Sequence, residues 1–243
     1  MTRVAFLTVL FSLLLEASAI GQIYILPKND FDKFVGVGAS ANPTLKAHLS
    51  GAYRFKNTFG SDNDLTLTAS LGTPIVLLGN FNSFDMLIGG AYHVQVIEGW
   101  TMNWVGAVTL ATTGNINGDF AAFSIDLALA PGYRAENWFA NLWIGGQYKL
   151  ATHIAHSDYA RRAFNDRYAN APNMSDALQD GWYRTNAWIW QVGASGGYHI
   201  GVVVLSLNLG LQVFQSETGV QMLPDLGIMP FYGTLGVVYC FGK

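Results

Sequence analysis

The sequence predicts an all-β fold, a transmembrane antiparallel up-and-down β-barrel, and two observations lead to this prediction. Apolar residues alternate with small or polar residues at a period of two, in segments separated by turn-rich breaks. On the apolar side of several segments, aromatic residues recur ten positions apart. The first pattern indicates strands with one apolar face, and the second matches the spacing of the two aromatic girdles of a membrane barrel.

The composition also favours a membrane protein over a soluble domain. Only 12% of the 243 residues are charged, whereas 51% are hydrophobic and 14% are aromatic. An average soluble domain has about 25% charged residues. The net charge of −3 provides no basic excess for binding phosphates, so no nucleic-acid partner is expected. With one cysteine, Cys240, an internal disulfide framework and a cysteine-based zinc site are excluded, and no cofactor is predicted.

Residues 1–19 have the features of a cleaved secretory signal peptide. A basic residue near the start is followed by an apolar run and by the small-residue ending Ala17-Ser18-Ala19. Residues 20–243 are then expected to form a single barrel domain. Because this part contains no run of 18 consecutive apolar residues, transmembrane helices are excluded, and strands remain as the elements that could span lipid.

Ten strands are expected, and each follows from its own alternation. The first three place small or polar residues such as Ser40, His48 and Thr66 on one face. The fourth, fifth and ninth alternate apolar with polar residues, and the others carry an aromatic pair. The predicted strands are 33–41, 45–55, 64–73, 84–96, 101–112, 120–133, 138–150, 186–200, 202–214 and 229–241. Because the turns of the first hairpin depart from the usual lengths, eight and twelve strands remain as alternatives.

The aromatic pairs indicate that the apolar face points outward into lipid. Ten residues at about 3.3 Å each, tilted by about 40°, span roughly 25 Å, the height between the two aromatic girdles. The opposite face lacks the Lys and Glu expected of a surface in water. The predicted interface aromatics are Phe123 and Tyr133, Trp138 and Tyr148, Trp188 and Tyr198, and Phe231 and Phe241.

The last segment, MPFYGTLGVVYCFGK, places aromatic and apolar residues on its outward face and ends two residues after Phe241. In this it resembles small bacterial outer-membrane β-barrel proteins, which present an aromatic-ended last strand to their assembly machinery. The resemblance implies the bacterial outer membrane as location, with its lipid and the barrel-assembly machinery as partners. It extends to architecture alone and implies no functional residues.

The inward face is the first candidate site. At ten strands the lumen is narrow, so its polar groups are expected to pair with one another and with water and to close it. These predicted lumen residues are Lys46, His48, Asp85, His93, Asp126, Arg134, Lys149, His199 and Asn208. The alternative is a narrow solute or ion channel with Asp126 and Asn208 near mid-height.

The long connection 151–185 is the second candidate site, an external lid loop in which two short helices are predicted. Ser157 or Asp158 could cap the first, and Ser175 the second. His153, His156, Ser157 and Asp158 could hold a metal, or form a hydrolase acting on lipid A or phospholipid. The HExxH pattern is absent and adjacent Ser157 and Asp158 cannot both reach one imidazole without a special turn, so no metal or catalytic residue is assigned. The sequence therefore favours a non-enzymatic barrel, structural or loop-presenting, with a largely closed lumen, and does not identify its ligand.

Overall fold

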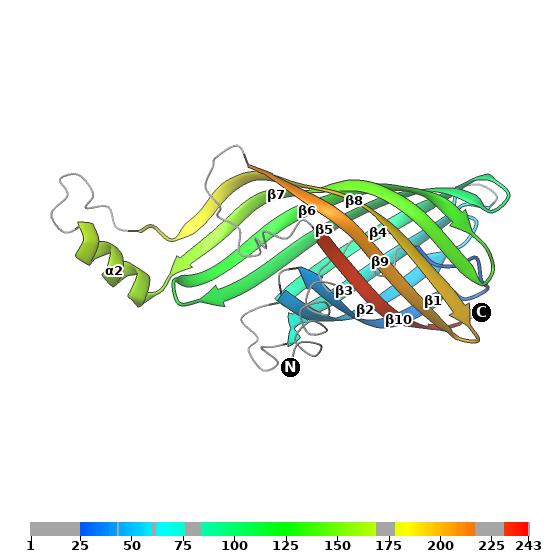
Figure 1. The fold of residues 1–243 in the computed structure, drawn as a ribbon, viewed down its shortest axis with the longest axis horizontal. Coiled ribbons are helices and arrows are strands. Elements are labelled where there is room, and N and C mark those ends of the chain that lie inside the picture. Colours follow the sequence, from blue (N-terminus) through cyan, green and yellow to red (C-terminus); the bar gives the residue numbers. More distant parts are fainter. Residues whose placement is uncertain are drawn as a thin grey trace, which may run out of the picture.

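The computed structural model describes residues 25–42, 44–59, 62–75, 84–168, 178–216 and 231–242. They form a closed antiparallel barrel in which every strand pairs with its neighbours in the sequence and β1 pairs with β10 (Figure 1). The predicted antiparallel all-β barrel is confirmed, with ten strands rather than eight or twelve, and its place in a membrane stays a prediction. Among the described residues, no helix is long and apolar enough to cross a membrane.

Each strand overlaps its predicted range, and β7 and β8 extend well beyond theirs. They are β1 (Lys33–Asn42), β2 (Thr44–Phe55), β3 (Asp64–Pro74), β4 (Phe84–Ile97), β5 (Trp100–Asn115), β6 (Gly118–Arg134), β7 (Trp138–His156), β8 (Gly181–Ile200), β9 (Val203–Ser216) and β10 (Phe231–Phe241). Helix α2 (Asp158–Tyr168) lies between β7 and β8. We call the end where β1 begins and β10 ends the terminal end, and the opposite end the helix end.

Strand β3 shows how the two faces of the sheet differ. Thr66, Thr68 and Ser70 are buried, whereas Leu67 and Leu71 on the other face are 46% and 50% exposed. The same arrangement holds around the barrel, where large apolar side chains are exposed and polar side chains are buried. A water-soluble barrel has the opposite polarity. The apolar face of the sheet therefore points outward and the polar face inward, as the sequence predicts.

The predicted lid is shorter than expected, because residues 151–156 and 181–185 belong to β7 and β8. The β6–β7 and β7–β8 registers both shift around Leu150. Beyond this bulge the buried side chains of β7 change from odd to even positions, as in Lys149 and Thr152. The alternation that identifies a strand is interrupted there, so the predicted loop begins before β7 ends.

Strands β5 to β8 are the longest, at 16 to 20 residues, and β1 to β3 have 10 to 12. The long strands extend the sheet at the helix end, and α2 lies at the far end of this extension, not across the barrel interior (Figure 1). The expected lid over the barrel mouth is therefore not formed by α2. The second predicted helix, beginning at Ser175, lies outside the described residues.

Two aromatic side chains meet inside the barrel over a pair of glycines. Trp143 on β7 lies opposite Gly193 on β8. Tyr232 on β10 lies opposite Gly210 on β9, and the two glycines lie opposite each other. Both aromatic side chains are buried, with ring centroids 5.4 Å apart. Since neither glycine carries a side chain, the two rings can approach each other and fill the interior at this level.

Candidate functional site

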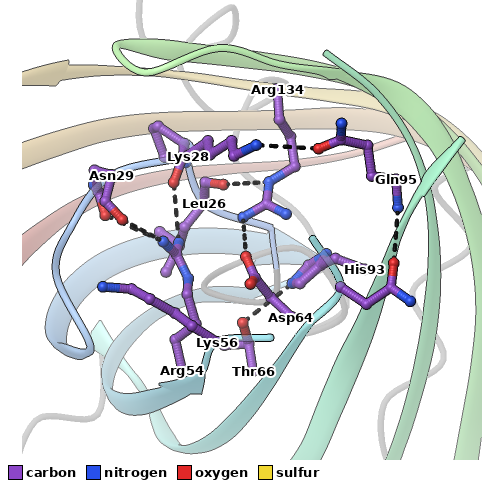
Figure 2. A network of polar contacts seen from close by, with 12 residues as sticks. Leu26, Lys28, Asn29, Arg54, Lys56, Asp64, Thr66, His93, Gln95 and Arg134 are labelled. Atoms are coloured by element: carbon purple, nitrogen blue, oxygen red, sulfur yellow. Dashed lines mark hydrogen bonds and ion pairs between the residues drawn. The ribbon is translucent and has the colours of Figure 1, made fainter. Parts of the chain in front are cut away.

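A short segment before β1, residues 25–32, crosses the terminal end of the barrel, and we call it the N-terminal strap. Ile25 and Leu26 are buried and belong to the apolar core at this end. The Nη2 of Arg54 donates a hydrogen bond to the Pro27 carbonyl (3.1 Å), and the Nε of Arg134 donates to the Leu26 carbonyl (2.8 Å). Figure 2 shows both guanidinium groups facing the strap.

The strap is bound from several sides of the barrel. The Lys28 amide donates to the Ala135 carbonyl (2.9 Å), and the Lys28 ammonium donates to the Gln95 side chain on β4 (3.1 Å). The ring of Phe31 contacts the His199 ring on β8 edge-on, with centroids 5.8 Å apart. Together with Arg54 on β2 and Arg134 on β6, these contacts come from all around the lumen. The strap therefore closes much of the terminal end.

Further bonds fix the strap where it joins β1. The Asp32 amide donates to the Gly242 carbonyl (3.2 Å), and the Asp32 carbonyl accepts from the Arg54 amide (2.7 Å). Lys56 forms an ion pair with the Asp32 carboxylate (2.9 Å) and donates to the Asp30 carbonyl (2.5 Å). The strap is not predictable from the sequence, because only the apolar Ile25 and Leu26 indicate it there.

The predicted lumen residues lie on the inner face, but they bind mostly to residues outside the predicted set. Lys46 and Asp85 are the exception, with an ion pair of 2.7 Å. His48 is hydrogen-bonded to Ser40. The His93 ring bonds Thr66 (3.1 Å) and Asn103 (2.7 Å). Arg134 bonds Asp64 (3.4 Å) as well as the strap.

Asp126 and Asn208 also lie inside the barrel, and each has one polar atom that is unpaired. The Thr109 hydroxyl donates to the Asp126 carboxylate (2.6 Å), and the Trp143 indole donates to the Asn208 side-chain oxygen (2.9 Å). The second carboxylate oxygen of Asp126 and the Asn208 amide nitrogen are buried without a protein partner. Lys149 is also buried on the inner face. Such orphaned polar atoms imply ordered water in this part of the lumen.

The predicted interface aromatics lie on the outer face. Phe123, Trp138, Tyr198, Phe231 and Phe241 are exposed. The other three are partly exposed and contact aromatic neighbours, as in the stacking of Tyr133 on Trp138 and of Trp188 on Trp190, and in the Tyr148 ring 4.7 Å from Trp188. Their place at a lipid interface stays a prediction.

In the second candidate site, the predicted serine has a structural role. The Ser157 hydroxyl donates to the Ile116 carbonyl (2.6 Å) and accepts from the Ala160 amide (3.1 Å), so Ser157 is the N-cap of α2, and Asp158 is its first residue. The His153 ring instead contacts Trp182, with centroids 5.2 Å apart. No bond joins Ser157 to an imidazole in this part of the structure. Across the described ranges, no group of three metal-ligating side chains is found.

His156 binds Asp180, and this contact fixes the start of α2 against β8. The His156 amide and its Nδ1 both donate to the same Asp180 oxygen, each at 2.9 Å, and Arg161 on α2 bonds the other oxygen. These donors, chiefly the His156 amide, hold the pKa of the Asp180 carboxyl below its ordinary value. The contact stabilises the folded loop while Asp180 is ionised.

The variant Asp180→Asn should loosen α2 without affecting the barrel. Because the pKa of Asp180 is lowered, its stabilising effect is complete above the ordinary carboxyl pKa of about 4 and is lost as pH falls through the lowered pKa. We expect hydrogen exchange of the α2 amides, corrected for intrinsic rates, to quicken about two- to fivefold in the variant at pH 6. Acidification should loosen α2 more in the wild type than in the variant, in which only carboxylates such as Asp158 remain to be protonated. Asp119→Asn, at an exposed carboxylate on β6, is the control and should leave α2 unchanged.

No family model and no curated protein matches the chain. Among solved structures, the chain is similar to CdiB from Acinetobacter baumannii, with 11% sequence identity and a TM-score of 0.37. The matched region covers 77% of this chain and 32% of that one. The chain thus spans about a third of the length of CdiB.

Proposed function

We propose that residues 20–243 form an outer-membrane barrel, exported by a cleaved signal peptide, whose resting state is closed at the terminal end and whose role is structural or loop-presenting. The observation that carries this proposal is the inverted polarity of the sheet. Exposed side chains such as Leu49, Leu207 and Val237 are apolar, and the polar side chains are buried inside. Lipid suits the outer face, and the closed sheet leaves no unpaired strand edge in the bilayer.

Closure is supported by the strap and by the side chains behind it. The strap is bound from four strands of the barrel, and the aromatic rings of Phe139, Trp143 and Tyr232 are buried within. In the described part of the chain, these groups narrow the path through the lumen. The outward face of β10 would serve the assembly machinery, and the β7–α2–β8 extension is the surface that the barrel presents.

A narrow channel is the second candidate, and the orphaned polar atoms of Asp126 and Asn208 favour it. They indicate water at mid-height in the lumen. In a channel, Asp126→Asn would change the ion selectivity, because a carboxylate in a narrow pore attracts cations. In a closed barrel the same variant would have no effect on conductance.

Planar-bilayer recording of refolded residues 20–243 distinguishes the two candidates. We expect the inserted protein to show no discrete conductance steps. Steps that scale with salt concentration, with a reversal potential altered by Asp126→Asn, would contradict closure and establish the channel. Insertion is verified separately by heat-dependent electrophoretic mobility, so that silence is not confused with failure to enter the bilayer.

The outward face gives a direct test of membrane placement. Leu207 is 48% exposed and lies opposite Leu235, which is between Phe231 and Phe241 on β10. Leu207→Arg should make folding into lipid vesicles less favourable by about 2 kcal/mol, because an arginine near the middle of the lipid-facing band is costly. Tyr159→Arg, at an exposed position on α2, should change it by less than about 0.5 kcal/mol. Equal effects of the two variants would refute the lipid-facing assignment.

A further inference from the structure

Two buried arginines converge at the terminal end from different strands. Arg54 on β2 is 2% exposed, and Arg134, the last residue of β6, is 4% exposed. Their guanidinium groups face the same strap segment (Figure 2). The acceptors that the strap offers are the carbonyl oxygens of Leu26, Pro27 and Asn29 and the Asn29 side-chain oxygen. Every one of these acceptors is neutral.

The charge of the two guanidinium groups is only partly balanced. Asp64 lies 3.4 Å from the Nη2 of Arg134, and within the described ranges no carboxylate lies within 4.0 Å of Arg54. The Nε of Arg54 is buried and has no acceptor. The Phe34 ring lies 4.9 Å from the Arg54 guanidinium carbon, and the charges of Asp64, Asp32 and Arg134 act on Arg54 from farther away. Buried cations without a counter-charge in direct contact are costly. Arg54 has no such counter-charge and keeps one unused donor, its Nε.

We infer that Arg54 and Arg134 form a binding site for a phosphate-type oxyanion and that the N-terminal strap occupies it with its carbonyl oxygens. An oxyanion supplies several acceptors in one group, together with the negative charge that the carbonyls lack, and guanidinium groups bind phosphate in paired hydrogen bonds. The unpaired Nε of Arg54 is available for one of them. This inference goes beyond the proposed function and does not rest on membrane placement.

The strap can leave this site without breaking the barrel. None of residues 25–32 is part of a strand, and the ladder between β1 and β10 begins at Lys33. Strap and oxyanion would need the same guanidinium groups, so they compete. Loosening the strap should therefore strengthen phosphate binding, and phosphate should loosen the strap.

The test measures phosphate binding by equilibrium dialysis on residues 20–243 in detergent micelles, with and without Leu26→Gln. Leu26 is buried, and a polar side chain there weakens the strap without adding a charge. We expect Leu26→Gln to bind inorganic phosphate at least about tenfold more tightly than the wild type, and Arg54→Gln in the same background to lose at least about tenfold, since each charge-assisted bond contributes that much. Lys33→Gln removes an exposed cation of β1 at the same end and should change binding less than about threefold.

A second measurement uses the unaltered sequence of residues 20–243. At matched ionic strength, phosphate should quicken tryptic cleavage after Lys28 relative to chloride. Dihexanoyl phosphatidic acid is tested beside inorganic phosphate, and tighter binding of the lipid would identify a headgroup as the source of the oxyanion. The inference is overturned if folded Leu26→Gln binds phosphate no better than the wild type, or if Lys33→Gln loses as much as Arg54→Gln. Should Leu26→Gln not fold, an absence of any phosphate effect on cleavage of the wild type overturns it.

Discussion

Replacing Trp143 by alanine should lower the free energy of unfolding by about 4 kcal/mol, because it removes the largest ring from a tightly packed level of the lumen. The indole is 6% exposed, contacts the Tyr232 ring and donates to Asn208 at 2.9 Å. Its removal leaves a cavity and a second orphaned polar atom on Asn208, whose amide nitrogen is already unpaired. Urea titration of the refolded protein in lipid vesicles measures this change.

Two further variants test separately how the hydrogen bond and the packing of Trp143 contribute to the free energy of unfolding. Trp143→Phe keeps one ring but loses the bond to Asn208 and part of the indole's volume, so about 2 kcal/mol is expected. Gly210→Ala keeps the indole but crowds Tyr232, because a Cβ at Gly210 would lie 2.1 Å from the tyrosine oxygen and 2.5 Å from the Val192 carbonyl. About 2 kcal/mol is expected for this overpacking. The control is Trp182→Ala, at an exposed tryptophan of β8, with an expected loss below about 1 kcal/mol. A loss for Trp143→Ala as small as that of the control would contradict the packing described for this level.

The strands could be predicted from the sequence because each residue of the sheet is either inside or outside, with no intermediate layer. In β3 the buried Thr66, Thr68 and Ser70 alternate with the exposed Leu67 and Leu71, and this alternation is directly readable. The barrel closure and the number of strands follow from ten such segments. Where a bulge interrupts the alternation, as at Leu150, the prediction fails, and the facing ends of β7 and β8 were assigned to a loop.

The strap could not be predicted for a different reason. Most of its bonds to the two arginines go to backbone carbonyls, which every residue has, so these bonds leave little trace in the residue types. Arg134 was expected among the lumen residues, but its bond to the strap was not, because the strap has no periodicity. The hydrolase hypothesis at His153, His156, Ser157 and Asp158 likewise rested on residue types. In the structure Ser157 caps helix α2, and the His156 ring is hydrogen-bonded to Asp180.

Replacing Arg134 by methionine should both destabilise the barrel and release its strap. The variant removes the bond to the Leu26 carbonyl and leaves the Asp64 carboxylate without its arginine. Breaking a buried ion pair by removing one partner costs about 3 kcal/mol or more, and a similar fall in the free energy of unfolding is expected here. Methionine retains the apolar volume of the arginine stem, so the loss reports on the polar contacts rather than on packing.

Strap release is measured in the same samples by tryptic cleavage after Lys28, which is held near the lumen wall by Ala135 and Gln95. Cleavage should be at least about tenfold faster in Arg134→Met, because losing a charge-assisted bond shifts the open population by that factor. Arg162→Met, at an exposed arginine of α2, is the control and should change neither stability nor cleavage at Lys28. If Arg134→Met lowered the stability while Lys28 stayed protected, the strap would be held by its apolar residues Ile25 and Leu26, and the arginines would serve the barrel wall alone. If both measurements change together, the closure of the terminal end depends on the bond from β6 to the strap.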